Sequence, residues 1–260
     1  MKRGSYKTHA VILNFFDYGE SDRILAFYTG SYGKLKGIAK GARRSRKRFV
    51  GNLEIASHIM LGFFHSEKSD LVRVENVTLV NGFANVRKDI ERLSEACYLV
   101  ELVSEMTREG MIQPAVYSLL LSFLNMLNAG ADPGVTLRFF EIKLLSVLGL
   151  MPHLDACVAC RRPFGGEDAV AAKVSFSSEK GGIVCGQCAR GSFANIPISA
   201  GSARFLCAAE RLDADKLGRL KPDAAFVREA GAMLDDFIRH QLGKELKTKI
   251  FLDKLKEAAV

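Results

Sequence analysis

Two Cys-x-x-Cys pairs constrain the fold of this chain more than any other feature. The first is Cys157-Val-Ala-Cys160, and the second, after 24 residues, is Cys185-Gly-Gln-Cys188. Each pair places two thiolates on a tight turn, and two such turns together form the tetrahedral sulfur shell that Zn²⁺ favours. The spacer is slightly longer than in most zinc ribbons, but a loop absorbs extra length at small entropic cost. The pattern predicts one bound Zn²⁺, with a redox or degenerate pair as the alternative.

The expected role of this zinc is structural. Four cysteine ligands close the coordination shell and leave no position for an activated water molecule. The two remaining cysteines, Cys97 and Cys207, stand alone in the sequence. Paired cysteines of this kind indicate a metal site in a reducing compartment rather than disulfides, so we expect a cytoplasmic protein.

The first 80 residues have the pattern of a small β barrel. Short apolar runs alternate with turn residues, and glycines recur between them. Several short strands in a segment of about 80 residues are typical of a closed barrel, and the OB-fold is the common barrel of this size. The expected strands are Ala10–Phe16, Asp22–Tyr28, Lys34–Ala39, Leu53–Phe64 and Leu71–Val80.

From Val86 onward the apolar residues recur at helical spacing, up to Gly110. Further expected helices are Ala115–Leu127, Thr136–Leu148, Ala203–Leu212, Ala225–Leu242 and Leu246–Leu255. The sequence therefore predicts an α+β fold in four parts. These are an OB-fold over 1–81, a first helical part over 82–152, a zinc-ribbon-like insert over 153–197 and a second helical part over 198–260.

Positive charge is concentrated in the predicted barrel. The formal net charge is +8, and residues 1–80 hold fourteen Lys and Arg against seven Asp and Glu. The stretch from Ile24 to Leu53 contains eight basic residues and no acidic one, which indicates a polyanionic partner. The predicted phosphate contacts are Lys34, Lys36, Lys40, Arg43, Arg44, Arg46, Lys47 and Arg48.

This basic segment begins with strand-like alternation. Lys34, Lys36, Ile38 and Lys40 are expected to share one face, with Leu35, Gly37 and Ala39 on the other. Aromatic residues nearby are candidates for stacking on bases, as in other OB-folds. They are Tyr18, Tyr28, Tyr32 and Phe49. The alternatives are a solvated charge run for the basic residues and ordinary core positions for the aromatic ones.

Arg138 lies in an otherwise apolar helical run, Leu137-Arg-Phe-Phe-Glu-Ile-Lys-Leu-Leu. One interpretation is an i,i+3 ion pair with Glu141. The other is an arginine at the rim of an apolar groove that binds an acidic partner peptide. In that case Phe139, Ile142 and Leu145 are the expected pocket walls.

The sequence lacks the motifs that are typical of several enzyme classes. The chain contains no GxxxxGK[ST] loop, no GxSxG, no HExxH and no kinase motif set. No apolar run is long enough to span a membrane. We therefore expect no catalytic residues and no membrane association.

A family resemblance follows from sequence segments that occur in the order barrel, helices, four-cysteine insert and helices. The N-terminal segments are Ala10-Val-Ile-Leu, Tyr18-Gly-Glu-Ser-Asp22, Tyr32-Gly-Lys34 and Ala39-Lys-Gly-Ala-Arg43. The later segments are Phe140 to Pro152, both cysteine pairs with Gly181-Gly-Ile-Val before the second, and Leu242 to Lys249. In this order they resemble the RecO family of bacterial recombination mediators, and the likeness covers nearly the whole chain. Arg44-Ser45 follows the basic Gly-Ala-Arg, where the family usually has serine directly.

The resemblance implies a function that composition does not show. RecO proteins bind single- and double-stranded DNA, anneal complementary strands and carry out no covalent chemistry. They engage the acidic C-terminal tail of single-stranded-DNA-binding protein, and with RecR and sometimes RecF they help to load the recombinase RecA. The expected location is the cytoplasm, at the nucleoid. A zinc-ribbon and OB-fold factor for RNA or translation is the alternative function, and an enzyme with an unrecognised site is a third.

Overall fold

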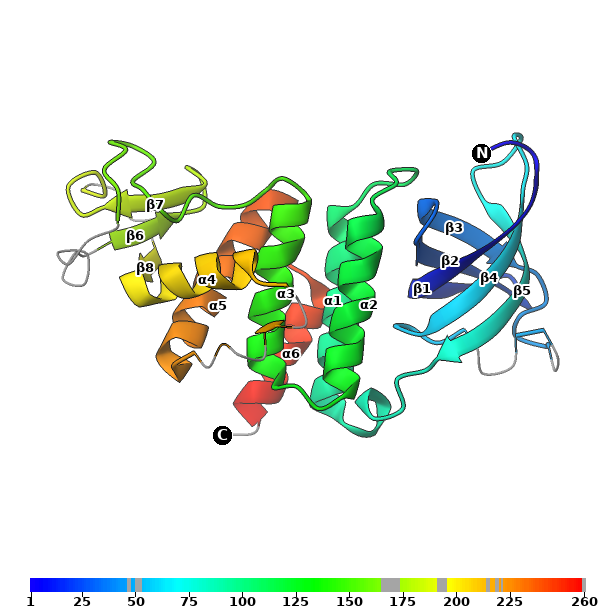
Figure 1. The fold of residues 1–260 in the computed structure, drawn as a ribbon. Coiled ribbons are helices and arrows are strands. Elements are labelled where there is room, and N and C mark those ends of the chain that lie inside the picture. Colours follow the sequence, from blue (N-terminus) through cyan, green and yellow to red (C-terminus); the bar gives the residue numbers. More distant parts are fainter. Residues whose placement is uncertain are drawn as a thin grey trace. The chain divides into compact units, whose positions relative to one another are not determined.

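The computed structural model describes residues 1–45, 48–49, 53–164, 174–190, 196–213, 216–217, 220 and 222–258 (Figure 1). The chain divides into two compact units, which are described separately below. Unit 1 comprises Met1–Gly130 and Leu246–Val260, and unit 2 comprises Ala131–Glu245. The C-terminal segment therefore returns to the unit that the N-terminus begins.

Unit 1 contains the predicted barrel. Its five strands close in the order β1-β2-β3-β5-β4, with β3 and β5 parallel and the other pairs antiparallel. Short strands that close on themselves leave no unpaired sheet edge, as in an OB-fold. The strands are β1 Gly4–Tyr18, β2 Asp22–Thr29, β3 Gly33–Ala39, β4 His58–His65 and β5 Val72–Asn81. The predicted barrel is confirmed.

Alternating side chains fill the barrel interior. Leu25 and Phe27 of β2 meet Leu61 and Phe63 of β4 there, and all four are completely buried. Val11, which alternates with inward-facing residues of β1, is also completely buried. Helix α1 packs on β1, so the middle of this strand, Ala10 to Leu13, is covered on both faces.

Strand β4 starts later than the predicted run, which began at Leu53. Ala56 has a left-handed φ of 62°, which breaks an extended strand. Its N–H donates to the carbonyl of Ile12 at 2.9 Å, and Ile12 N–H donates to the carbonyl of Ser57 at 3.1 Å. This turn is joined to β1 where the β1–β2 register shifts. Residues 53–57 therefore lead into the barrel, and the strand begins at His58.

The helices of unit 1 are α1 Ile90–Met106, α2 Pro114–Asn128 and α6 Lys247–Ala258. The apolar period suggested a start near Val86, but Asp89 caps α1 by accepting from the N–H groups of Glu91 and Arg92. Glu101 of α1 accepts from the N–H groups of Lys247 and Thr248 at 3.2 and 2.8 Å. A carboxylate at this position complements the positive end of α6 and binds the C-terminal helix to unit 1.

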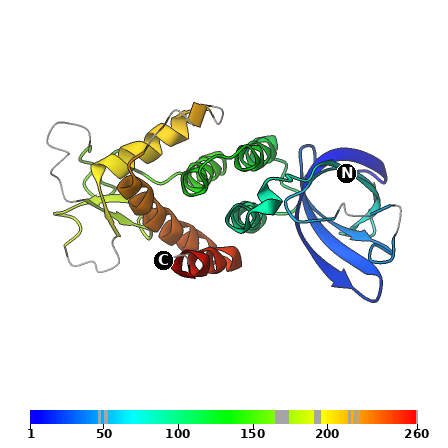
Figure 2. The same cartoon turned by 90° about the horizontal axis from the view of Figure 1, so that it is seen from below.

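Unit 2 combines helices with a small sheet. Helices α3 Pro133–Val147, α4 Ala200–Arg211 and α5 Ala224–Leu242 pack on one another. Strands β6 Val174–Ser177, β7 Gly182–Cys185 and β8 Ile196–Ile198 form an antiparallel sheet in the order β7-β6-β8. Figure 2 shows α4 and α5 together at the small sheet and diverging away from it.

Gly33, where β3 begins, allows a close approach of two backbone segments. Its φ is +65°, and a Cβ there would lie 2.1 Å from the carbonyl oxygen of Met111. Gly19 has a similar φ of +60°, but no heavy atom lies within 4 Å of its Cβ position. An alanine at Gly19 would therefore meet only an unfavourable backbone conformation, whereas an alanine at Gly33 would also overlap with a neighbouring backbone atom.

We predict that Gly33→Ala destabilises the protein much more than Gly19→Ala. A left-handed φ costs a residue with a Cβ roughly 1–2 kcal/mol at either position. Overlap with the Met111 carbonyl adds about 1–3 kcal/mol for Gly33→Ala. Urea unfolding of the two variants measures the difference, and equal losses of stability would contradict the close approach.

Candidate nucleic-acid interface and metal centre

Strand β3 carries the first half of the predicted basic segment with the expected alternation. Leu35 and Ala39 face the barrel core and are buried. Lys36 and Lys40 are exposed on the opposite face. The predicted sharing of faces along this strand is confirmed.

Lys34 and Lys36 both have partners near the C-terminal end of α1. The Lys34 ammonium donates to the carbonyls of Ser104 and Thr107 at 2.5 and 3.4 Å. These carbonyls lie at the negative end of a helix, where a cation is favourable. Lys36 Nζ lies 2.6 Å from Glu109 Oε1, with both side chains nearly half exposed. Lys34 thus stabilises the contact between barrel and helix, whereas Lys36 remains accessible.

The loop after β3 is attached to the β1–β2 turn. Gly41 N–H donates to the Asp22 carboxylate at 2.8 Å, and Arg43 N–H donates to the carbonyl of Ser21 at 3.0 Å. The Gly41 hydrogen bond is the main cause that lowers the pKa of Asp22. Lys40 and Arg44, on either side of these anchors, are exposed. The loop therefore presents basic side chains from a fixed backbone.

Acidic residues at the end of β1 and in the β1–β2 turn lie beside Arg43 and Arg44. Arg43 Nε is 3.4 Å from Asp17 Oδ2, and Arg44 Nη2 is 3.3 Å from Glu20 Oε2. The Arg44 and Glu20 side chains are 71% and 90% exposed, so their attraction is screened by water. Such a pair is easily exchanged for another anion.

Arg48 is the last predicted phosphate contact that the structure describes. Its guanidinium lies 5.1 Å from the centre of the Phe49 ring and donates to the carbonyl of Lys40 at 3.1 Å. Arg46 and Lys47 lie outside the described residues. The Arg48 side chain therefore reaches the residue that follows β3.

Of the four candidate stacking residues, Tyr18 is the exposed one. It is 56% exposed, whereas Tyr28 and Phe49 are buried and Tyr32 packs against Phe63. Phe16, two residues before Tyr18 on β1, is 55% exposed. Sequence analysis did not single out Phe16, although its i,i+2 spacing from Tyr18 places both on one strand face. The end of β1 therefore presents two aromatic rings to solvent.

The four predicted metal ligands come together in unit 2. Their Sγ atoms all lie within 4.8 Å of one another, and Cys160 Sγ is 3.8 Å from Cys185 Sγ. Cys185 ends β7, and its N–H points to Cys157 Sγ at 3.4 Å. Two turns and one strand thus bring together four sulfur atoms, which is the number of ligands in a closed tetrahedral metal site. The cluster can hold one metal ion.

Hydrogen bonds within the cluster shift the pKa values of its thiols in opposite directions. Burial raises the pKa of Cys157, but backbone N–H groups of Cys160, Cys185 and Ala159 outweigh it and lower the pKa to about 6. Hydrogen bonding with the Cys185 and Cys160 side chains raises the pKa of Cys188 to about 12. One thiol therefore becomes a thiolate readily while another keeps its proton. A bound divalent ion lowers the free-energy cost of deprotonating the four thiols, because it stabilises all four thiolates.

The Arg138 guanidinium is buried and has acidic neighbours. Its Nη1 lies 3.0 Å from Glu141 and 3.1 Å from Asp235, and it donates to the carbonyl of Gly231 at 3.2 Å. The i,i+3 pair that the sequence allowed is present. Asp235 was not foreseen because it lies on α5, far along the chain. The other predicted pocket residues are also buried, namely Phe139, Ile142 and Leu145.

Within the described part of the chain, no helix is both long and apolar enough to cross a membrane.

Two family models together match almost the full length. The model described as recombination protein O N terminal matches residues 1–83, and the model described as recombination protein O C terminal matches residues 87–250. The chain belongs to the RecO family. The first match covers the barrel, and the second includes the cysteine cluster and most of the helices.

Curated relatives in other bacteria match over similar lengths. DNA repair protein RecO of Syntrophus aciditrophicus is 35% identical over 255 residues, which cover 97% of each chain. The protein of the same name from Anaeromyxobacter sp. (strain K) is 37% identical over 251 residues, or 96% of each chain. That of Halalkalibacterium halodurans is 29% identical over 252 residues, covering 96% of this chain and 95% of the relative. The similarity therefore extends over both units.

We predict that Cys185→Ser releases the metal ion and lowers the stability of unit 2. A cluster that lacks one thiolate loses affinity, and metal-binding free energy is folding free energy in a small segment. Metal content of freshly purified, reduced protein and thermal unfolding measure both effects. Cys97→Ser, outside the cluster on α1, serves as control and should keep the metal. Wild-type protein without bound metal would refute the site.

Proposed function

We propose that this protein is a non-enzymatic DNA-binding recombination mediator of DNA repair. It binds single- and double-stranded DNA, anneals complementary strands and helps to load a recombinase on DNA covered by single-stranded-DNA-binding protein. Family membership supports this role over that of an RNA or translation factor. The observation that carries the proposal is the barrel edge where exposed Lys40, Arg43 and Arg44 lie beside the end of β1, which bears Phe16 and Tyr18. We call this set the basic edge.

The basic edge suits a phosphate backbone. A phosphate replaces Glu20 beside Arg44 at little cost, since an exposed ion pair contributes only about 0–1 kcal/mol. Release of counterions from the nucleic acid then drives association. The anchored loop holds these side chains in place, so less conformational entropy is lost on binding. Lys36, Arg46, Lys47 and Arg48 are proposed to extend the same contact.

Phe16 and Tyr18 provide a surface for unpaired bases. Base stacking on an aromatic side chain contributes roughly 1–3 kcal/mol per base and tolerates any sequence. Their location beside the β1–β2 turn matches a loop through which OB-folds commonly bind oligonucleotides. A sequence-independent grip of this kind suits a protein that must anneal any pair of complementary strands.

We assign the metal of the cysteine cluster as a single structural Zn²⁺. Cys157, Cys160, Cys185 and Cys188 supply four thiolates, the donor set that zinc takes in closed sites. When bound, the ion cross-links the two turns. The packed cluster around it is small, with Cys157, Val184 and Cys185 as its buried members, so the segment gains much of its stability from the metal.

The proposed protein partners are RecR, RecA, RecF and the acidic tail of single-stranded-DNA-binding protein, in the cytoplasm. Membership of the RecO family supports this set of partners as a whole and none of them individually. The tail was expected at Arg138, with Phe139, Ile142 and Leu145 as walls. Because these residues are buried, tail binding at this position requires α3 and α5 to separate near Asp235.

We predict that the triple variant Lys40→Gln, Arg43→Gln, Arg44→Gln weakens binding to all DNA sequences. Interactions with phosphates position DNA without reading bases, so the reduction in affinity should be uniform. The slope of log K against log salt should fall by about 1 for each phosphate interaction that the substitutions remove. Titration at several salt concentrations with single- and double-stranded DNA measures both, alongside annealing of complementary strands.

Lys68→Gln is the control for this variant. Lys68 is exposed on the same barrel, but Glu67 and Asp70 flank it, so it should contribute little. An unchanged slope in the triple variant would mean that the basic edge is only a solvated surface. DNA binding without annealing, together with tighter binding to RNA, would favour the translation-factor alternative.

We predict that Arg138→Ala weakens binding of the tail peptide if Arg138 is its anchor. A hydrogen bond between charged groups contributes about 1.5–3 kcal/mol, which changes affinity roughly tenfold or more. The same change leaves Glu141 buried without this cation, which costs about 3–5 kcal/mol of stability. The double variant Arg138→Met, Glu141→Gln removes both charges and preserves volume. Tail affinity within twofold of wild type in this folded variant would show that Arg138 is not the anchor.

A further inference from the structure

Two histidines face each other across the seam that closes the barrel of unit 1. The barrel closes by pairing of β1, which carries His9, with β4, which begins at His58 (Figure 1). His9 lies opposite Met60 and His58 lies opposite Val11, so the two histidines are diagonal neighbours on one face of the strand pair. His9 Nδ1 lies 3.1 Å from His58 Nε2. The seam therefore brings two imidazole nitrogens into direct contact.

A third polar group reaches the same nitrogen from helix α2. Tyr117 Oη lies 3.0 Å from His58 Nε2, and the two rings meet edge to face. An imidazole nitrogen either donates one proton or accepts one. His58 Nε2 therefore faces two polar atoms but can form a well-directed hydrogen bond with only one of them. A cation bound to the nitrogen lone pairs relieves this competition.

The surrounding backbone holds these side chains in place. Gly30 N–H donates to the carbonyl of His9 at 3.2 Å. A Cβ at Gly30 would lie 3.3 Å from the Tyr117 ring, so the ring packs closely against this turn. The His9 side chain is exposed, and that of His58 is partly buried. An ion therefore reaches the two nitrogens from solvent and meets donors that neighbouring strands keep in position.

The separation of the two nitrogens matches that of two ligands on one metal ion. Imidazole binds Zn²⁺ through a nitrogen at about 2.0–2.1 Å. Two such bonds place their nitrogens about 3.3 Å apart at a tetrahedral angle and about 2.9 Å apart at a right angle. The observed 3.1 Å falls between these values. A small rotation of the exposed His9 ring is then enough to direct both lone pairs at one ion.

The protonation states of the three side chains are compatible with this role. An imidazole must be neutral to bind a metal ion. Burial lowers the pKa of His58, and repulsion by a protonated His9 lowers this pKa further, so His58 is neutral at neutral pH. Burial raises the pKa of Tyr117, so its phenol keeps its proton. The metal ligands are therefore the two nitrogens, with water in the remaining positions.

We propose that His9 Nδ1 and His58 Nε2 bind one divalent transition-metal ion, such as Zn²⁺, at the seam of the barrel. Tyr117 Oη accepts a hydrogen bond from a water bound to the ion. Imidazole suits Zn²⁺, Cu²⁺ and Ni²⁺, whereas Mg²⁺ and Ca²⁺ prefer oxygen ligands. The ion cross-links β1 to β4 and thereby stabilises the closed barrel. This site is separate from the cysteine cluster and does not depend on DNA binding at the basic edge.

The test counts the zinc ions bound to the full chain. Equilibrium dialysis at neutral pH against dilute Zn²⁺, followed by metal analysis, should give one ion fewer per chain for His9→Gln than for wild type. The cysteine cluster is identical in both proteins, so the difference does not depend on its occupancy. Because His9 is exposed, its replacement leaves the barrel core intact. Equal ion counts would overturn the proposal.

His65→Gln is the matched control for the ion count. His65 is also a partly exposed histidine of β4, but its partner on β1 is Gly4. This variant should bind as many ions as wild type. Tyr117→Phe should also keep the ion, because the phenol is not a ligand. Loss of the ion from Tyr117→Phe together with its retention by His9→Gln would show that the two nitrogens are not the ligands.

Two further measurements locate the ion and separate it from the proposed function. Zn²⁺ should slow the reaction of diethyl pyrocarbonate with His9 and His58, read by mass spectrometry, and leave His65 unchanged. Zn²⁺ should also raise the midpoint of thermal unfolding more in wild type than in His9→Gln. Unchanged reactivity of both histidines, or an equal rise in the two proteins, would overturn the site. DNA binding by His9→Gln should equal that of wild type, so failure of the metal site and failure of the proposed function are distinguishable.

Discussion

Closure of the five-stranded barrel is the constraint on which the architecture of unit 1 depends. Leu25, Phe27, Leu61 and Phe63 fill its interior, so no ligand can enter between the strands. Any partner must then meet the outer surface or the loops. Part of that surface is already used, because α1 packs on β1 and the Lys34 ammonium joins β3 to the end of α1. The loop after β3, which is hydrogen-bonded to the turn after β1, is left as an accessible basic part.

Basic residues of similar sequence context have different roles because their surroundings differ. Lys34 neutralises helix carbonyls inside unit 1, and Arg138 lies buried among acidic groups in unit 2. Arg44 instead forms an exposed pair with Glu20. A buried cation without its partner is costly, whereas an exposed one exchanges partners at little cost. Exposure therefore separates the basic residues that stabilise the fold from those that remain accessible to a partner.

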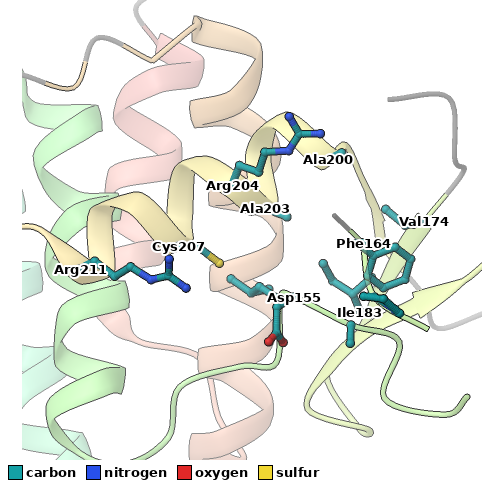
Figure 3. Close-up of a pocket in the computed structure, with 12 residues that line it drawn as sticks. Asp155, Phe164, Val174, Ile183, Ala200, Ala203, Arg204, Cys207 and Arg211 are labelled. Carbon is teal, nitrogen blue, oxygen red and sulfur yellow. The ribbon is translucent and has the colours of Figure 1, made fainter. Parts of the chain in front are cut away.

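In unit 2, the cysteine cluster lies in a small local core. The sheet of β6, β7 and β8 has short strands, and few apolar side chains surround the sulfur atoms. Phe164 packs against this cluster and also lines a pocket beside α4 (Figure 3). The four sulfur atoms can hold one metal ion, and an ion bound there would cross-link the two turns that carry them.

The sequence by itself determined the local features of this protein. Alternation of apolar residues predicted β2, β3 and β5 closely, whereas β1 begins six residues before the predicted Ala10–Phe16 run, and helical period predicted most helices. The spacing of Cys157, Cys160, Cys185 and Cys188 predicted a cluster that the fold does assemble. Each of these signals depends on residues that are close in the sequence, and the geometry of a helix, strand or turn alone fixes how such residues are placed. The resemblance to the RecO family added the order in which barrel, helices, four-cysteine insert and further helices follow one another.

Only the tertiary structure decided which side chains remain accessible. Nothing near Tyr28 or Phe49 in the sequence shows that they are buried while Phe16 and Tyr18 are exposed. The late start of β4 depends on a contact with Ile12, and the second acidic neighbour of Arg138 comes from α5. The pocket walls likewise come from segments that are distant along the chain. Burial and pairing of this kind arise from long-range packing, which a local sequence pattern does not encode.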